Sequence, residues 1–372
     1  MKVSCLLIDT LRDPTIVRRY SSSEWDVLLR QARSANLLAQ LGVLLQQALE
    51  QQEVPDKVRQ HLHSARLIVK RQNRAIRWEV GLLQHAMYDL AVPIVVLKGA
   101  GYVLAGLPNS YGRLFHDIDI LVPRSALGEV ETRLRQWGWG TTHHNAYDQR
   151  YYRRWMHELP PLQHRQRQTV LDVHHSILPL TARLNPNPRK LINNAVTDPE
   201  NEDVYWLSPE DMVLHSMTHL FHDGELENGL RDLVDMEILL NHFAEEKGFW
   251  TQLTRRAEVL ELTRPLYYGL RYTGSVLQAP IPGETLNMVS ECGPGLLLGK
   301  LMDFLFLNAL QPAHATCNTL STSIASWILY VRSHYLRMPL RLLIPHLIHK
   351  AVVKEHDDKI PRKLRNILDN TQ

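Results

Sequence analysis

The stretch GRLFHDIDILVPRS, residues 112–125, places two acidic residues at the start of an apolar β-strand. Asp117 and Asp119 stand two positions apart, and the aliphatic residues 120–122 that follow predict the buried body of the strand. Because alternate side chains of a strand point to the same face, the two carboxylates share one face and the isoleucines between and after them share the other. Two carboxylates on one face are suited to hold a divalent cation.

A third carboxylate lies in the stretch QTVLDVHHSI, residues 168–177. Asp172 is flanked there by Leu171 and Val173, so it is an acid in a setting that otherwise reads as buried. Burying an unpaired carboxylate costs free energy unless a metal or a partner compensates it. We therefore predict a strand over 168–174 that brings Asp172 to the first two acids, as a further member of the metal site or as a base.

The stretch VPIVVLKGAGYVLAGLPNS, residues 92–110, predicts a strand over 93–97, a tight turn over 98–101 and then a short helix. Such a turn directs backbone N–H groups outward, where they can hold an anion.

The rest of the chain reads mainly as helix. An amphipathic helix is expected from a Ser-rich cap at Ser21 to about Leu49, and a longer one over 56–90 with a solvated basic side. Further expectations are a helix capped by Ser125 and ended by Gly138, strand-like pieces over 140–155, and helices from an N-cap at Ser208 onward. The predicted fold class is α+β, a small mixed-sheet core at 91–180 between helical regions at 1–90 and 181–372.

Composition sets the broad class. The 372 residues are 44% hydrophobic and 22% charged, with a formal net charge of +3, which is ordinary for a globular protein and does not by itself indicate nucleic acid. Cys5, Cys292 and Cys317 are isolated, which fits a reducing cytoplasm better than a disulfide framework or a zinc site. The first residues lack the features of a signal peptide, and no apolar run approaches the ~20 residues that span a bilayer. We expect a cytoplasmic protein.

These stretches, with LSPEDMVLHSMTHLFHDGELENGLRDLVDMEILL at 207–240, resemble a family of uncharacterised bacterial nucleotidyltransferases over about residues 25–245. That family is a branch of the DNA polymerase β-type nucleotidyltransferase superfamily. The resemblance implies that Asp117, Asp119 and Asp172 form a metal triad for Mg²⁺ or Mn²⁺. It also implies nucleotide-binding positions at Lys98, Gly99, Ala100 and Arg113. Lys98 and Gly99 depart from the superfamily's usual Gly-Ser turn, and Arg113 is expected either to reach the triphosphate or to hold its loop.

The resulting hypothesis is a metal-dependent nucleotidyltransferase that moves an NMP from an NTP, ATP included, to an acceptor and releases pyrophosphate. The acceptor stays open between a sugar phosphate, an antibiotic-like small molecule, tRNA and a protein side chain. The alternative is a non-catalytic protein that binds a nucleotide or macromolecule; the altered turn favours it and the intact triad disfavours it. Haloacid-dehalogenase phosphatases and many sugar-nucleotide glycosyltransferases carry Asp-x-Asp after the hydrophobic strand, whereas here the acids precede it.

Several polar residues have a structural interpretation that we favour over a functional one. His174 and His175 are expected to orient or pack. His215, His219 and His222 recur on one helix face, but no acid set accompanies them, so a structural role is favoured over a metal site. Arg231, Asp232 and Asp235 are expected to form a polar network on a helix.

Two basic segments bear on partners. Arg150, Arg153, Arg154, Arg165 and Arg167 are interleaved with Tyr147, Tyr151, Tyr152 and Trp155, a mixture that suits RNA, although a solvated hairpin is favoured because no known nucleic-acid motif is present. Residues 326–354 are apolar with regularly placed basic residues, as in a helix on a membrane surface. Pro339 and Pro345 interrupt them, so a helix covering the core is favoured.

Overall fold

The computed structural model describes residues 5–141, 145–198, 201–224 and 226–343. Its sheet has seven strands in the order β3-β4-β5-β2-β1-β7-β6. The strands are β1 Val95–Val96, β2 Asp117–Leu121, β3 Trp139–Thr141, β4 Leu162–His164, β5 Val170–His174, β6 Val196–Asp198 and β7 Asn201–Trp206. β2 runs antiparallel to β1 and parallel to β5, so the sheet is mixed, and the predicted α+β class is confirmed.

The register of β2 and β5 places the predicted acids side by side. Asp119 pairs with Asp172 across these two strands. The alternate residues Ile118, Ile120 and Val173 are no more than 1% exposed and belong to one core cluster. A slip of one residue would turn these aliphatic side chains to the opposite face, so burial of the apolar face fixes the register that aligns the carboxylates.

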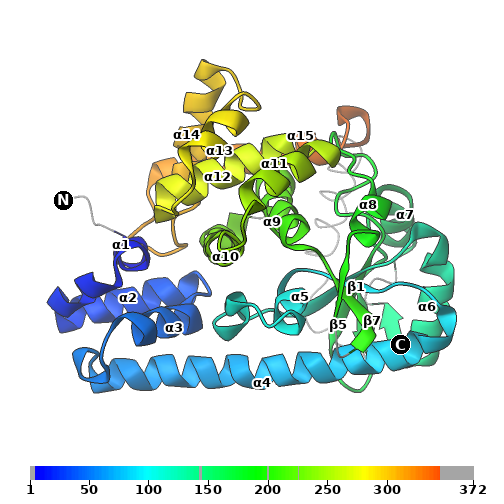
Figure 1. Ribbon diagram of the computed structural model, residues 1–372, viewed down its shortest axis with the longest axis horizontal. Coiled ribbons are helices and arrows are strands. Elements are labelled where there is room, and N and C mark those ends of the chain that lie inside the picture. The colour runs from blue at the N-terminus through cyan, green and yellow to red at the C-terminus, as the bar shows by residue number, and fades with distance from the viewer. Residues whose placement is uncertain (1–4, 142–144, 199–200, 225, 344–372) are drawn as a thin grey trace, which may run out of the picture.

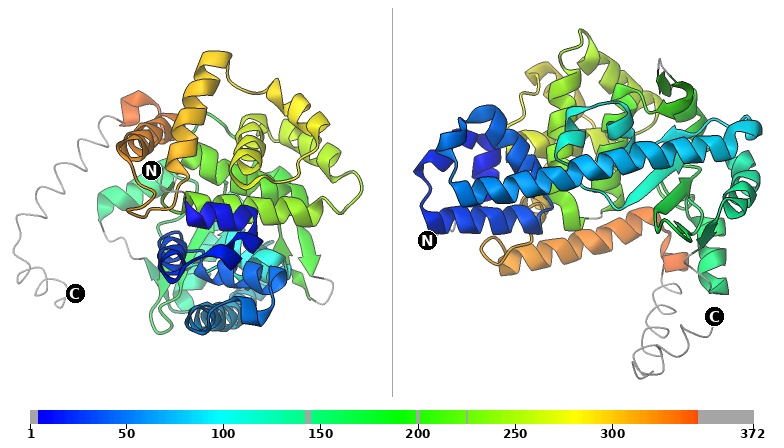
Figure 2. Two further views of the ribbon diagram at one scale, coloured as in Figure 1. Left: turned by 90° about the vertical axis from the view of Figure 1, so that its left-hand side faces the viewer. Right: turned by 90° about the horizontal axis from the view of Figure 1, so that it is seen from below.

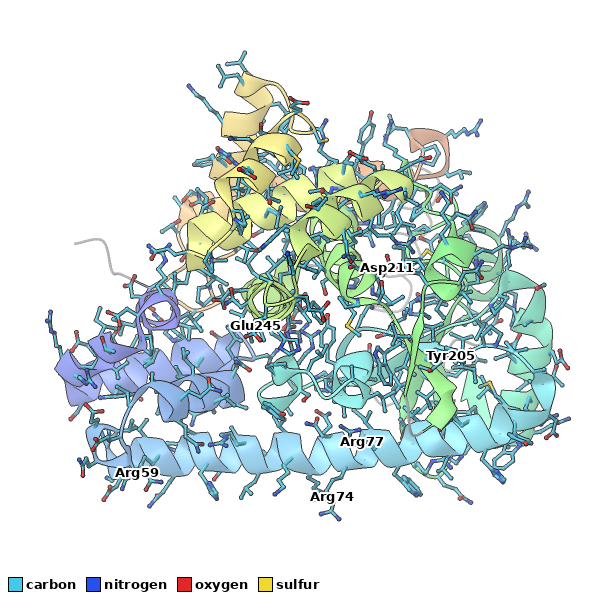
Figure 3. All side chains as sticks on the ribbon, viewed as in Figure 1. Arg59, Arg74, Arg77, Tyr205, Asp211 and Glu245 are labelled. Atoms are coloured by element: carbon cyan, nitrogen blue, oxygen red, sulfur yellow. The ribbon has the colours of Figure 1, made fainter. Side chains whose placement is uncertain are left out.

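The N-terminal helices form one side of the molecule. They are α1 Leu6–Arg12, α2 Ser22–Ser34, α3 Leu38–Ala48 and α4 Asp56–Met87. Figure 1 shows α4 as one long helix that passes beneath α3, α5 (Lys98–Leu104) and the sheet. The predicted division of its faces holds only in part: Arg74 points away from the body, but Arg77, expected on the solvated basic side, points towards it (Figure 3) and donates a hydrogen bond to the Val103 carbonyl. Ile68, expected in the core, is exposed.

The remaining helices follow β2. They are α6 Leu127–Gln136, α7 Ala146–Trp155, α8 Pro188–Ile192, α9 Pro209–Thr218, α10 Gly229–Phe243, α11 Phe249–Val259, α12 Thr263–Leu277, α13 Gly283–Ser290, α14 Leu296–Ala309 and α15 Leu320–Arg337. Figure 2 shows, in two further views, the C-terminal helices gathered on the side of the molecule away from α4. Ser208 caps α9 by accepting a hydrogen bond from the Asp211 N–H, and Pro209 begins the helix, as predicted.

Three local predictions are wrong. The helix expected over 21–49 is two helices, because Asn36 adopts the left-handed region (φ 55°) and breaks it; asparagine tolerates that conformation well. The strand-like interpretation of 140–155 holds at residues 140–141, which end β3, but it is wrong for 146–155, which form α7 with its first turn capped by the Asn145 side chain. Ser125 is not the cap of α6, since it lies inside a 3₁₀ turn, Arg124–Ala126, that precedes the helix.

The core expected at 91–180 supplies five of the strands. The sheet also takes β6 and β7, which lie beyond residue 180, because β7 pairs in parallel with the inner strand β1. The division into three regions stays a prediction.

In the described part of the chain, no helix combines the length and the apolar character needed to cross a membrane. The segment 326–354, for which a helix over the core was favoured, is described only as far as residue 343. Its first part forms the C-terminal half of α15, and residues 344–354 lie outside the described residues.

Candidate active site

Three carboxylates converge where β2 and β5 run side by side. Asp117 and Asp119 come from β2 and Asp172 from β5, and one oxygen of each lies within 4.8 Å of the others. Asp117 is the first residue of its strand, so the acids stand at the N-terminal end of β2, as the sequence indicates. Asp172 Oδ1 is buried and has no hydrogen-bond partner. A buried, unsatisfied carboxylate oxygen beside two other carboxylates is a donor set that fits a divalent cation.

Asp119 is the most enclosed of the three acids, at 4% exposure. Lys98 Nζ lies 3.2 Å from Asp119 Oδ1, and His174 Nε2 donates a hydrogen bond to the same oxygen at 2.8 Å. Burial opposes ionisation of Asp119, but Lys98 and His174 outweigh it and hold the pKa of this carboxyl below its usual value. Asp119 is therefore an anion throughout the physiological pH range.

Asp117 and Asp172 have pKa values that are raised, in contrast to the lowered pKa of Asp119. Burial and the negative charge of Asp119 raise the pKa of Asp117. Burial, with the charges of Asp119 and Glu158, raises the pKa of Asp172 to about 7. The site therefore carries more negative charge than Lys98 balances, which is the condition under which a bound cation stabilises a cluster of acids.

The predicted phosphate turn is the first turn of α5 and not a separate loop. Lys98 begins the helix with φ 46°, and its ammonium group pairs with Asp119. At Gly99 a Cβ would lie 2.8 Å from the Phe115 ring, so only glycine permits this close approach. Ala100 is 1% exposed and packs in the core. A nucleotide role for these positions stays a prediction.

Arg113 holds its loop against α10. Its guanidinium forms ion pairs with Asp232, at 3.3 Å, and with Asp235, and all three side chains are close to nine-tenths buried. Arg231 also pairs with Asp232, at 2.8 Å. The polar helix network expected at 231–235 is thus present and includes Arg113. Contact between Arg113 and a triphosphate stays a prediction.

A cavity of about 190 Å³ lies beside the acids. Its walls include Lys98, Asp117 and Asp119 on the sheet side, and Ser216, His219 and Asp232 on the side of α9 and α10. The helical region after residue 208 therefore forms one wall of the space that the two β2 carboxylates face.

The histidines divide between two places. His174 orients Asp119 through the hydrogen bond described above, and its Nδ1 lies 3.3 Å from Glu158 Oε2. His215 is buried, and burial lowers its pKa to about 3. Among the described residues, His215, His219 and His222 are not part of a metal-type cluster. Their structural role stays a prediction.

Sequence reasoning missed Glu158 and its neighbour His157. Glu158 forms an isolated antiparallel bridge with His174. The segment between α7 and β4 therefore lies alongside the end of β5 and brings Glu158 to the site. The sequence signal for these two residues, an acid next to a histidine ahead of two prolines, was weak. The segment expected to be strand-like ended at residue 155, just before them.

The basic and aromatic segment at 147–167 is α7 followed by β4 and the turn into β5. The favoured hairpin is wrong for the residues on α7, but Arg165 and Arg167 do lie in the turn of the antiparallel β4–β5 pair. Arg153 pairs with Glu131 of α6 at 2.7 Å, and Arg167 pairs with the buried Glu79 of α4 at 2.6 Å. These two arginines join elements of the protein. RNA as a partner stays a prediction.

Comparison with known proteins gives one family. The family described as uncharacterised nucleotidyltransferases matches residues 21–278. No curated protein matches the chain. Two solved structures are similar at 13% identity: the solution structure of the antibiotic-resistance factor ANT(2'')-Ia, with a TM-score of 0.32 over 49% of this chain and 92% of that one, and the crystal structure of ANT(2'')-Ia with adenylyl-2''-tobramycin, with a TM-score of 0.34 over 54% and 99%.

Proposed function

The chain belongs to the family of uncharacterised nucleotidyltransferases, and from this premise we propose that it transfers an NMP from an NTP to an acceptor. The observation that carries the proposal is the convergence of Asp117, Asp119 and Asp172, with an unsatisfied Asp172 Oδ1 among them. A divalent cation held there, Mg²⁺ or Mn²⁺, would neutralise charge on the triphosphate and orient the attacking and leaving oxygens.

The residues divide the work in this proposal. Asp119 is held ionised and in place by Lys98 and His174, so it can serve as a permanent ligand. Asp117 lines the cavity at the strand entrance. Asp172 completes the donor set or accepts the proton of the attacking hydroxyl. The acceptor oxygen forms a bond to the α-phosphorus, the bond to the bridging oxygen of pyrophosphate breaks, and the acceptor proton leaves.

The cavity between the sheet and α9–α10 is the proposed place of the nucleotide. Lys98 lies on its wall beside the acids, where an ammonium group can approach a phosphate. The acceptor class is not distinguished by these walls, which combine arginine and aspartate side chains of α10.

The test is NTP binding by calorimetry with and without Mg²⁺, for the wild type and for Asp117→Asn/Asp119→Asn. We expect Mg²⁺-dependent binding of at least one NTP and its loss in the double variant, because asparagine keeps the shape but removes the anionic ligands. Asp26→Asn, an exposed acid of α2, is the control and should bind as the wild type does.

The NTP that binds would then be used with a label on its α-phosphate to search for an acceptor. If folded wild-type protein binds no NTP, the proposal fails and the non-catalytic binding protein replaces it. Binding that persists without metal and in the double variant would favour the same alternative.

A further inference from the structure

A second cluster of metal-type donors lies next to the carboxylates. His157 and Glu158 come from the segment between α7 and β4, and His174 is the last residue of β5. One ligand atom of each lies within 4.8 Å of the others. Glu158 Oε2 lies 3.3 Å from His174 Nδ1 and 3.9 Å from His157 Nε2. The family match assigns no role to this cluster, and the proposed nucleotidyl transfer uses only His174, through its hydrogen bond to Asp119.

The backbone holds these residues in place. The His175 N–H donates to the His157 carbonyl at 2.8 Å, and the Leu159 N–H donates to the Val173 carbonyl at 2.9 Å. Glu158 and His174 form the bridge between these two hydrogen bonds. The segment is therefore fixed on the edge of β5, and its side chains do not need a large rearrangement to meet a ligand.

We propose that His157, Glu158 and His174 bind a divalent transition-metal cation, with Zn²⁺ as the first candidate. Two imidazoles and one carboxylate are a donor set that zinc uses in sites with an open fourth position. Ligand bonds of about 2.0–2.1 Å in a tetrahedron require donor atoms roughly 3.4 Å apart. The separations of Glu158 Oε2 from His174 Nδ1 and from His157 Nε2, 3.3 Å and 3.9 Å, lie on either side of that value, so small side-chain rotations suffice.

The imidazoles are suited to this role. His157 is 8% exposed, its Nδ1 is buried without a hydrogen-bond partner, and burial holds its pKa well below the usual value, so the ring is neutral and can donate a lone pair. His174 donates its Nε2 hydrogen to Asp119, which leaves Nδ1 directed at the Glu158 carboxylate. A divalent cation between Nδ1 and the carboxylate would take the place of the proton on this nitrogen.

The hydrogen bond from His174 to Asp119 connects this site to the carboxylate triad. A metal-ligating histidine commonly donates its other ring hydrogen to a carboxylate, which fixes the ring orientation. Here the accepting carboxylate is Asp119. An ion bound to the other ring nitrogen of His174 would therefore fix the orientation of Asp119. Nitrogen donors favour zinc over magnesium, so the two places differ in the cation they select.

The test uses the full-length protein, stripped of metal by chelator and titrated with Zn²⁺ by calorimetry. With Mg²⁺ in excess to fill the carboxylate triad, we expect one zinc site in the wild type and an affinity lower by roughly tenfold to 100-fold in His157→Gln and in Glu158→Gln. His61→Gln, on the exposed face of α4, is the matched control and should bind as the wild type does. Equal affinity in the wild type and both cluster variants, or no zinc binding by the wild type, would overturn the proposal.

A second measurement covers variants that fail to fold. X-ray absorption of zinc-loaded wild type should show nitrogen and oxygen neighbours with two imidazoles, and a sulfur neighbour or a shell without imidazole would overturn the proposal. NTP binding with Mg²⁺, measured in the wild type and in Glu158→Gln, separates the two proposals. A wild type that binds zinc but no NTP overturns only the proposed function. A wild type that binds NTP but no zinc overturns only the zinc site.

Discussion

The carboxylates of Asp119 and Asp172 lie side by side on β2 and β5, but they differ in the groups that compensate their charge. Asp119 has an ammonium group and an imidazole within hydrogen-bond distance of one oxygen. Asp172 has an oxygen with no partner and a pKa raised to about 7. Since the pKa of Asp172 is higher in the folded than in the unfolded protein, its contribution to stability is present below about pH 4 and is lost as the pH rises through 7.

Asp172→Asn should therefore stabilise the metal-free protein at pH 8. Removal of the uncompensated charge is expected to raise the free energy of unfolding by about 1–3 kcal/mol, measured by urea denaturation with chelator present. The same variant should lose the stabilisation that Mg²⁺ gives the wild type. Asp26→Asn, whose side chain is 64% exposed, should change neither quantity. A metal-free Asp172→Asn protein less stable than the wild type would contradict this account.

At the scale of elements, the segment between α5 and β2 is held from two sides. Gln72 and Asn73 of α4 donate hydrogen bonds to the carbonyls of Phe115 and Ser110. Arg113 pairs with α10 on the other side. The position of Asp117, two residues after Phe115, thus depends on helices that lie about forty residues before it and more than a hundred after it in the chain.

Asp235→Ala should be strongly destabilising, because it leaves the buried Arg113 without one of its partners. We expect a loss of about 3–5 kcal/mol in the free energy of unfolding, the usual result when one member of a buried ion pair is removed. In a double-mutant cycle, Arg113→Leu/Asp235→Ala should cost less than the sum of the single changes, because each single change already breaks the Arg113–Asp235 pair and leaves a buried charge without it. Strict additivity would show that the two side chains do not interact.

At the scale of the whole molecule, five histidines of the described residues have pKa values lowered by burial. Burial lowers the pKa of His175 to about 4, of His215 to about 3 and of His222 to about 4. The pKa values of His157 and His219 lie well below the usual value for the same reason. These groups favour the folded state fully above about pH 6.5, and that contribution is lost as the pH falls, since the unfolded chain binds protons that the folded one excludes.

The metal-free protein should lose stability between pH 7 and pH 5.5. Each buried histidine contributes about 1 kcal/mol to this loss, and Asp172 and His174, whose pKa values are raised, offset part of it. Urea denaturation across this range measures the slope. His215→Asn should reduce the proton uptake on unfolding by about one, whereas His242→Asn, on an exposed position, should not. A stability that rises on acidification would refute the prediction.

The local pattern of apolar and acidic residues was enough to predict where the three acids lie. An apolar strand after Asp117 and Asp119, and a second one around Asp172, predict their faces, and burial of the aliphatic residues then fixes the register. The N-cap at Ser208 and the end of α6 at Gly138 were likewise predictable, because caps are set by residues within one turn.

Only the tertiary structure decided the surroundings of those acids. Glu158 reaches His174 through a bridge between separate segments, Arg113 finds its partners on α10, and β7 joins the sheet beside β1. The break at Asn36 and the helix at 146–155 also went against the sequence interpretation. Periodicity reports which face of an element is apolar, but it does not report which distant element covers that face. The sequence therefore determined on which strands and on which face the carboxylates lie. The packing of distant elements determined which side chains hold the carboxylates and which side chains face them.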